Sequence, residues 1–185
     1  EVQGLRARVD AILTGAGTVK ADDPRLTLRS LAVGAAPKRV VLDSYLRTSP
    51  KAQLFQAPAE GELGGAVIIL TLAGADGARW RALVEAGALV VGLHGDESGR
   101  VSLADAYEWL WGEGVRRVLL ESGPDLLSSH FDAELVDQLR VYTGDVFGGR
   151  GVSLGTVLAG LEFSGRLDRE CGSDAVLESF LLPED

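Results

Sequence analysis

Residues 66–93 read AVIILTLAGADGARWRALVEAGALVVGL, and this stretch holds the clearest secondary-structure pattern of the chain. It opens with an uninterrupted apolar run at 66–72 and closes with a second one at 88–93. Apolar runs of this length, without polar alternation, are typical of strands that are covered on both faces. Between them Trp80, Leu83 and Val84 recur at the spacing of one helix face, and Gly87 follows as a helix-ending residue. The stretch predicts a strand, a helix over 77–86 and a second strand.

The same alternation continues on both sides of this stretch. Ser102 with Asp105 three positions later resembles a capping box and marks a helix start. Such alternation predicts an α/β fold, a three-layer sandwich whose mostly parallel central sheet is covered by helices on both faces. The last two strands have no obvious helix between them, which predicts an antiparallel C-terminal edge. Further strands are predicted at 10–13, 39–42, 115–120, 138–143 and 175–182, and further helices at 102–111 and 125–136.

Length and composition indicate one globular domain over residues 1–185. The chain is 46% hydrophobic and 24% charged, and it shows no internal repeat and no domain linker. Its net charge of −9 repels a nucleic-acid backbone, so no nucleic-acid partner is expected. Because no apolar run approaches the roughly 20 residues of a spanning helix, no membrane association is expected either. A single cysteine, Cys171, fits a reducing cytoplasm.

The histidines and the cysteine are too few for a metal site. Cys171, His94 and His130 are the full set, so neither a structural nor a catalytic zinc site is expected. We expect His94 in a loop and His130 on a helix surface, and neither is assigned to catalysis.

Ligands of open α/β sheets bind at the carboxyl ends of the strands. Four segments follow predicted strands here, at 14–19, 43–44, 121–124 and 148–151. The first begins like a dinucleotide-binding fingerprint, but Lys20 stands where the third glycine belongs, so an ordinary glycine turn is the alternative. Glu121 ends an apolar strand just before a helix, where a carboxylate is typical of a functional site.

The run from Ala21 to Arg29 is less specific on residue types alone. Asp22, Asp23 and Pro24 are turn residues and are typical of a solvated turn. Arg25 and Arg29 are most simply surface charges.

Three blocks of sequence, taken in order, carry a resemblance to a known family. The first block spans 5–27 and includes Gly-Ala-Gly-Thr-Val followed by Ala-Asp-Asp-Pro-Arg-Leu. The second spans 39–50, and the third comprises 120–124, 135–139 and 147–149. Together they resemble the reductase family of riboflavin biosynthesis, which forms the C-terminal half of the bifunctional pyrimidine deaminase/reductase.

The resemblance implies a dihydrofolate-reductase-like fold and a defined reaction. Members use NADPH to reduce the ribosyl group of 5-amino-6-(5-phosphoribosylamino)uracil to ribityl, with hydride passing to C1′ of the opened sugar. It also implies a homodimer and an N-terminal deaminase domain as partner in the full-length protein. The deaminase motifs His-x-Glu and Pro-Cys-x-x-Cys are not in these residues. The family's first strand and a Ser-Leu-Asp-Gly-like turn precede the first block, so we expect an N-terminally incomplete domain that lacks this strand.

The resemblance assigns the substrate side to Arg6, Leu26, Arg29 and Glu121. The two guanidinium groups hold the ribose phosphate, because a planar fork of donors suits a phosphate at any pH. Glu121 meets the polar groups of the substrate ring and counts as catalytic.

The cofactor side is assigned to Thr18, Asp22 and Ser44 and to the start of the helix that follows Gly123. Its backbone N–H groups and dipole favour the cofactor pyrophosphate. Asp22 is also given a catalytic role, stabilising the protonated imine of the opened sugar. The helix-start residues are Gly123, Pro124, Asp125, Leu126, Leu127, Ser128 and Ser129.

Arg47 is predicted from the residues themselves to bind the 2′-phosphate of NADPH, together with Thr48. No acidic residue follows Asp43 in this segment to bind a free 2′-hydroxyl. Two other functions stay open, a reductase of a pterin-like heterocycle and a nucleotide-binding module without turnover.

Overall fold

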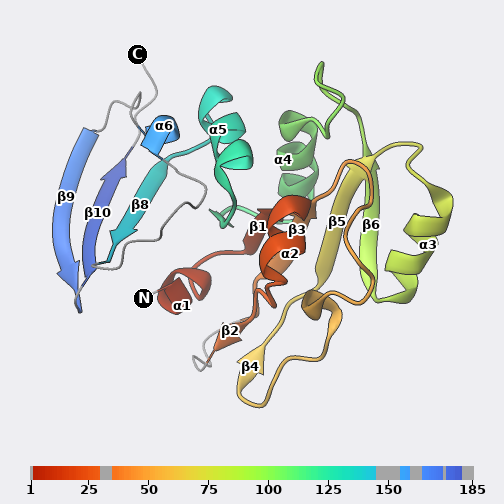
Figure 1. Cartoon of the computed structure of the whole chain (residues 1–185), viewed down its shortest axis with the longest axis horizontal. Helices are drawn as coiled ribbons and strands as arrows, with labels where there is room; N and C mark the ends of the chain where they lie inside the picture. The colour runs from red at the N-terminus through yellow and green to blue at the C-terminus, as the bar shows by residue number, and fades with distance from the viewer. Residues whose placement is uncertain (1, 30–34, 145–154, 159–163, 173, 181–185) are drawn as a thin grey trace. The chain divides into compact units, whose positions relative to one another are not determined.

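The computed structural model describes residues 2–29, 35–144, 155–158, 164–172 and 174–180 (Figure 1). The chain divides into two compact units, with the boundary between Ser122 and Gly123. Each unit has its own sheet, and we describe them separately.

The first unit is built on a five-stranded sheet in the order β6-β5-β3-β1-β7. Every neighbouring pair in it is parallel, as the uninterrupted apolar runs predict. The predicted strands are confirmed, with shifts of up to three residues at their ends. The strands are β1 (Ala11–Gly15), β3 (Lys38–Leu42), β5 (Val67–Leu72), β6 (Ala88–Leu93) and β7 (Val118–Leu120).

Helices cover both faces of this sheet. On one face α2 (Ala16–Asp22) and α3 (Gly77–Glu85) pack over Val41 and Ile69. On the other face α4 (Leu103–Gly112) packs over Val40 and Ile68. These four side chains are at most 1% exposed, because successive strand residues point to opposite faces and both faces are covered. The predicted cap of α4 is confirmed, since Ser102 Oγ accepts the Asp105 N–H at 3.2 Å.

Several short elements of the first unit were not predicted. Helix α1 (Val2–Arg6) opens the chain, and β2 (Leu28–Arg29) pairs with β4 (Glu62–Leu63) in an antiparallel ladder. A 3-10 turn at Gln53–Phe55 lies between β3 and β4. Two-residue strands and single turns are too short to show a hydrophobic period, so no pattern in the residues indicates them.

The second unit holds a three-stranded antiparallel sheet in the order β8-β10-β9. The predicted antiparallel C-terminal strands are therefore confirmed. Strand β9 was not predicted, because its residues are mostly polar. Positions 181–182 of the strand predicted at 175–182 lie outside the described residues. Helix α5 is shorter than the predicted 125–136, since Glu134 takes a left-handed φ of 53°. The elements are α5 (Pro124–Asp132), β8 (Gln138–Thr143), α6 (Gly155–Leu158), β9 (Ser164–Cys171) and β10 (Asp174–Phe180).

His130 contradicts its predicted place on a helix surface. It lies on the buried face of α5 with 1% exposure, and its Nδ1 is 2.7 Å from the carbonyl oxygen of Leu126. Burial lowers the pKa of the His130 imidazole, because the charged form loses its hydration. His130 is therefore neutral in the folded protein at neutral pH.

This burial predicts an acid-sensitive fold. The pKa of His130 in the unfolded chain is the ordinary value of about 6.5, and in the folded chain it is lower. In the window just below pH 6.5, unfolded His130 therefore takes up a proton and folded His130 does not. We expect the free energy of unfolding to fall as pH decreases through this window. In His130→Phe this part of the pH dependence should disappear in urea titrations, while His94→Ala serves as the control. An unchanged pH slope in His130→Phe would contradict the assignment.

No described helix is long and apolar enough to cross a membrane.

Candidate active site

The sheet of the first unit has a point where its strand order reverses. From β1 the chain proceeds to β3 on one side, whereas β7 pairs with the other side of β1. Crevices that bind ligands form outside the carboxyl ends of strands at such a point. Glu121 follows β7 here, and its N–H donates to the carbonyl oxygen of Leu13 at 2.9 Å. The segments predicted at 14–19 and 43–44 and the first residue of the one at 121–124 lie at this edge. The segment predicted at 148–151 lies outside the described residues.

Arg6 and Glu121 form a two-pronged ion pair beside this edge. Arg6 Nε and Nη2 donate to the two carboxylate oxygens at 2.7 and 2.6 Å. Arg6 Nη1 donates to the carbonyl oxygen of Thr27 at 2.7 Å. The two charged side chains are only 14% and 25% exposed. The first and third blocks of the resemblance therefore meet through one guanidinium group.

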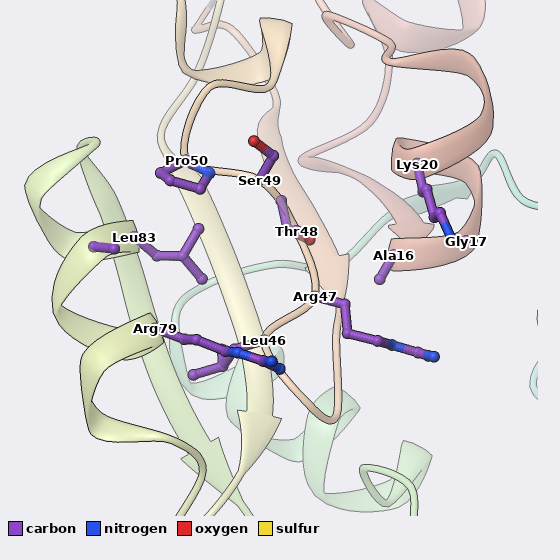
Figure 2. A pocket seen from close by; sticks show the side chains of 11 residues that line it. Ala16, Gly17, Lys20, Leu46, Arg47, Thr48, Ser49, Pro50, Arg79 and Leu83 are labelled. Atoms are coloured by element: carbon purple, nitrogen blue, oxygen red, sulfur yellow. The ribbon is translucent and has the colours of Figure 1, made fainter.

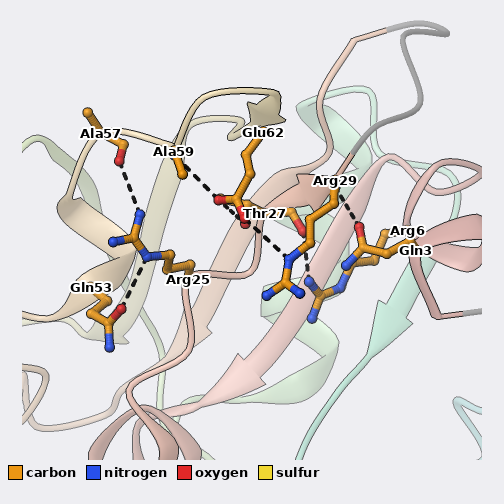
Figure 3. A network of polar contacts seen from close by, with 9 residues as sticks. All are labelled: Gln3, Arg6, Arg25, Thr27, Arg29, Gln53, Ala57, Ala59 and Glu62. Atoms are coloured by element: carbon orange, nitrogen blue, oxygen red, sulfur yellow. Dashed lines mark hydrogen bonds and ion pairs between the residues drawn. The ribbon is translucent and has the colours of Figure 1, made fainter.

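Arg29 lies two residues after Thr27, in β2, the strand that contacts α1, and Arg6 belongs to α1 (Figure 3). Its Nε is 3.2 Å from a carboxylate oxygen of Glu62, but its side chain remains 70% exposed. The Arg29 backbone N–H donates to the Gln3 side chain at 2.6 Å. A hydrogen bond from the Thr27 hydroxyl lowers the pKa of Glu62, so this carboxylate is charged at neutral pH.

The structure thus places Arg6 and Arg29 on two contacting segments, α1 and β2, and gives each an acidic partner. Their role as a phosphate clamp stays a prediction. Leu26, the third predicted substrate residue, is 3% exposed and has a left-handed φ of 52°. Such a conformation is unfavourable for leucine and is retained where the surroundings impose it. Glu62 was not predicted, because it lies far from both arginines in the sequence and belongs to a two-residue strand.

Asp22 and Asp23 have different roles in the structure. Asp23 ends α2 with a left-handed φ of 42°, and its carboxylate accepts the Gln53 N–H at 2.8 Å. Asp22 is exposed, and its side chain forms no hydrogen bond or ion pair within the described residues. It lies four residues after Thr18, so the two share one face of α2. The turn predicted at this site is shaped by Asp23, and Asp22 is left available.

Asp43 organises the loop that follows β3. It is 1% exposed, and its carboxylate accepts the N–H groups of Arg47 and Thr48 at 2.9 and 2.6 Å. Leu46 takes a left-handed φ of 51° within this loop. Ser44 Oγ accepts the Val101 N–H at 3.0 Å, so the predicted cofactor residue Ser44 also ties this loop to the segment before α4.

A pocket of about 540 Å³ lies between α2, this loop and α3 (Figure 2). It contains Arg47, as predicted for a phosphate site, together with Lys20 and Arg79, which the prediction missed. None of the described residues that line it is acidic. Thr18, Asp22 and Ser44 are not among the lining residues. The lining consists of Ala16, Gly17, Lys20, Leu46, Arg47, Thr48, Ser49, Pro50, Arg79, Ala82 and Leu83.

The Asp43 carboxylate is expected to hold this pocket in shape. Replacing it in Asp43→Asn removes the charge and turns an amide NH₂ toward one of the two backbone donors. We expect a loss of about 1.5 kcal/mol in the free energy of unfolding, the low end for one charge-assisted hydrogen bond. Urea unfolding measures this, with the exposed Asp132→Asn as control. Equal stability of the two variants would contradict the role of Asp43.

Helix α5, in the second unit, begins as predicted. Gly123 is its N-cap and Pro124 its first residue, and the N-cap glycine supplies no side-chain hydrogen bond. The Ser129 hydroxyl donates to the Asp125 carbonyl oxygen at 3.0 Å, inside the helix. The backbone of the first turn, rather than this hydroxyl, is therefore the group that can meet an anion.

Among the described residues no cluster of three or more His, Cys, Asp or Glu side chains could hold a metal ion.

Known proteins resemble this chain over most of its length. A 2,5-diamino-6-ribosylamino-4(3H)-pyrimidinone 5′-phosphate reductase of Archaeoglobus fulgidus is 37% identical, with 80% of this chain and 68% of the relative covered. The reductase of the same name from Methanothermobacter thermautotrophicus is 36% identical, with 80% and 66% covered. The crystal structure of Acinetobacter baumannii RibD, form 1, superposes with a TM-score of 0.70 at 25% identity, over 98% of this chain and 49% of that one.

The chain therefore spans about two thirds of these archaeal relatives and about half of the bacterial protein. The structural likeness confirms the predicted fold class, with its parallel sheet, covering helices and antiparallel C-terminal strands. The family model described as RibD C-terminal domain matches residues 1–164 of this chain. The chain belongs to the RibD C-terminal domain family.

Proposed function

We propose that this chain is an NADPH-dependent reductase of a phosphorylated ribosylaminopyrimidine in riboflavin biosynthesis. The observation that carries the proposal is that Arg6, which holds Glu121 at the strand-order reversal, and Arg29 lie on two contacting segments, α1 and β2. Family membership supports it, and the archaeal relatives are named for a reductase of this chemistry.

The substrate phosphate meets Arg29 first, because that side chain is largely exposed. Arg6 uses three of its five N–H donors on Glu121 and Thr27, so two remain for a phosphate oxygen. The ion pair also fixes Glu121 in one orientation. Each of its carboxylate oxygens keeps a further lone pair, which can accept an N–H of the pyrimidine ring.

The reaction adds a hydride to C1′ of the opened sugar. A reduced nicotinamide, when bound, supplies this hydride. The acceptor carbon is most electrophilic when the neighbouring imine nitrogen carries a proton, and a nearby carboxylate stabilises that cation. Asp22 is the carboxylate we assign to this task, since it is exposed and unpaired in the described part of the chain.

The pocket between α2 and α3 fits a phosphorylated cofactor. Its lining has three cations, and the Thr48 hydroxyl is buried without a hydrogen-bond partner in the described residues. A buried hydroxyl of this kind is unfavourable until an acceptor reaches it, and a phosphate oxygen is such an acceptor. Arg47 and Thr48 would hold the cofactor here. The first turn of α5, in the second unit, stays a predicted site for an anion.

The proposal extends to the oligomeric state, the cellular compartment and the identity of the pyrimidine substrate. We propose a homodimer in the cytoplasm. The archaeal relatives are named for the 2,5-diaminopyrimidinone, whereas a Thermotoga maritima structure is named for the uracil substrate and also for a deaminase activity. Arg6 and Arg29 favour a phosphorylated substrate over a pterin, which has no phosphate.

The test is NADPH oxidation by the full-length protein with each of the two pyrimidine phosphates, and with dihydrofolate as the pterin arm. We expect oxidation with a pyrimidine phosphate, and a higher KM in Arg29→Ala but not in the control Arg81→Ala. Oxidation with dihydrofolate alone would replace this proposal with the pterin reading. Cofactor binding without oxidation of any substrate would replace it with a binding module.

A further inference from the structure

Three cations from three separate segments line the pocket between α2 and α3. Lys20 comes from α2, Arg47 from the loop after β3, and Arg79 from α3. Figure 2 shows Arg79 extending from its helix toward the loop, and Arg47 extending toward the helix that carries Lys20. In the described residues none of the three side chains pairs with a carboxylate.

The positive charge of this pocket is opposite in sign to the net charge of the whole chain. The chain has 27 acidic and 18 basic residues, yet no acidic residue lines the pocket. The buried Asp43 carboxylate nearby is occupied by the backbone N–H groups of Arg47 and Thr48. The side chains of the lining residues are therefore what an anion would meet.

Two of the lining residues are fixed in place before any ligand binds. Arg79 Nη1 donates to the carbonyl oxygen of Tyr45 at 3.2 Å, and the Arg47 guanidinium lies 5.5 Å from the centre of the Tyr45 ring. Tyr45 is itself anchored, since its hydroxyl donates to the Gly99 carbonyl oxygen at 2.9 Å. Holding the cations in this way reduces the entropy lost on binding.

The chemistry that suits this pocket is a phosphomonoester dianion. Guanidinium groups offer paired donors to phosphate oxygens, and a lysine adds a compact charge. The buried Thr48 hydroxyl, which lacks a partner in the described residues, can join them. The group around Arg6 and Arg29 shares no residue with this lining, so a substrate phosphate and a second phosphate each have their own site.

We propose that Lys20 and Arg79, together with Arg47, bind the 2′-phosphate of the cofactor and set its preference for NADPH over NADH. This inference rests on the proposed function for the identity of the cofactor. Beyond that function, Lys20 and Arg79 are the residues that determine the specificity for NADPH over NADH.

Calorimetry on the full-length protein tests this, with 2′-AMP and ribose 5-phosphate as separate probes. The variants are Lys20→Gln and Arg79→Gln, and the matched controls are the exposed Lys51→Gln and Arg81→Gln, which lie outside the pocket. We expect each pocket variant to weaken 2′-AMP and NADPH at least about fivefold, as for the loss of one charge-assisted contact. Binding of NADH and of ribose 5-phosphate should not change.

Two results would overturn the inference. One is equal 2′-AMP affinity in the pocket variants and their controls. The other is weaker ribose 5-phosphate binding with unchanged 2′-AMP binding, which would make the pocket a substrate-phosphate site. Because these readouts need no turnover, a failed reductase assay with intact 2′-AMP discrimination refutes the proposed function alone, and the reverse result refutes this inference alone.

Discussion

Replacing Asp22 by asparagine is expected to lower turnover of the full-length protein by about a hundredfold while leaving its Tm almost unchanged. The asparagine keeps the shape of the side chain but removes the charge that would stabilise the protonated imine. Loss of one preorganised electrostatic group typically costs about 2.7–4 kcal/mol of transition-state stabilisation. Since Asp22 is exposed and unpaired in the described residues, folding should not depend on it.

The neighbouring Asp23→Asn is the matched control for this prediction. Asp23 holds the end of α2 and accepts the Gln53 N–H, so its replacement should lower Tm. Stopped-flow NADPH oxidation and thermal unfolding on the same samples separate the two residues. Intact turnover in Asp22→Asn, or a drop in Tm that parallels the drop in turnover, would make Asp22 a structural residue.

A second large effect is expected at Arg6. In Arg6→Ala the half-buried Glu121 carboxylate loses both charged donors, and Thr27 loses one donor to its carbonyl. Removing one partner of a buried ion pair costs about 3–5 kcal/mol, and we expect about 3 kcal/mol because Glu121 retains some contact with water. Urea unfolding should show this loss, and substrate binding should weaken as well.

Two further variants separate the ion pair from the lost arginine side chain. Arg29→Ala should change the free energy of unfolding by less than about 1 kcal/mol, because an exposed pair contributes little. The double variant Arg6→Ala with Glu121→Gln should regain part of the lost stability, since it leaves no unpaired charge. If Arg6→Ala were as stable as Arg29→Ala, the pair would be neither structural nor a means of orienting Glu121.

The parallel sheet and two of its covering helices, α3 and α4, were predictable because their signals are local and repeated, whereas α2 (Ala16–Asp22) was not predicted. A buried strand is indicated directly by the apolar runs at 66–72 and 88–93. A helix start is indicated in the same way by the cap at Ser102. Strand β9 was not predictable in this way. Its residues from Ser164 to Cys171 are mostly polar, and its place beside β10 comes from pairing rather than from apolar periodicity.

The candidate site was predictable only in part, because its contacts join distant segments. Glu121 was indicated by its place after an apolar strand, and Arg6 and Arg29 by resemblance, but the ion-pair partners of all three are seen only in the structure. Lys20 stood out in the sequence merely as a departure from a glycine pattern. Arg79 carried no signal, since a helix-surface arginine is ordinary until the fold places it beside a loop from another strand.

The most direct test of the account follows the transferred hydrogen. The full-length protein is incubated with NADPH that carries deuterium at both C4 positions of the nicotinamide and with each pyrimidine phosphate in turn. We expect a ribitylamino product with one deuterium at C1′, located by mass spectrometry and proton NMR. A reduced product without deuterium at C1′, or no reduced product while NADPH is bound, would contradict the proposed reductase.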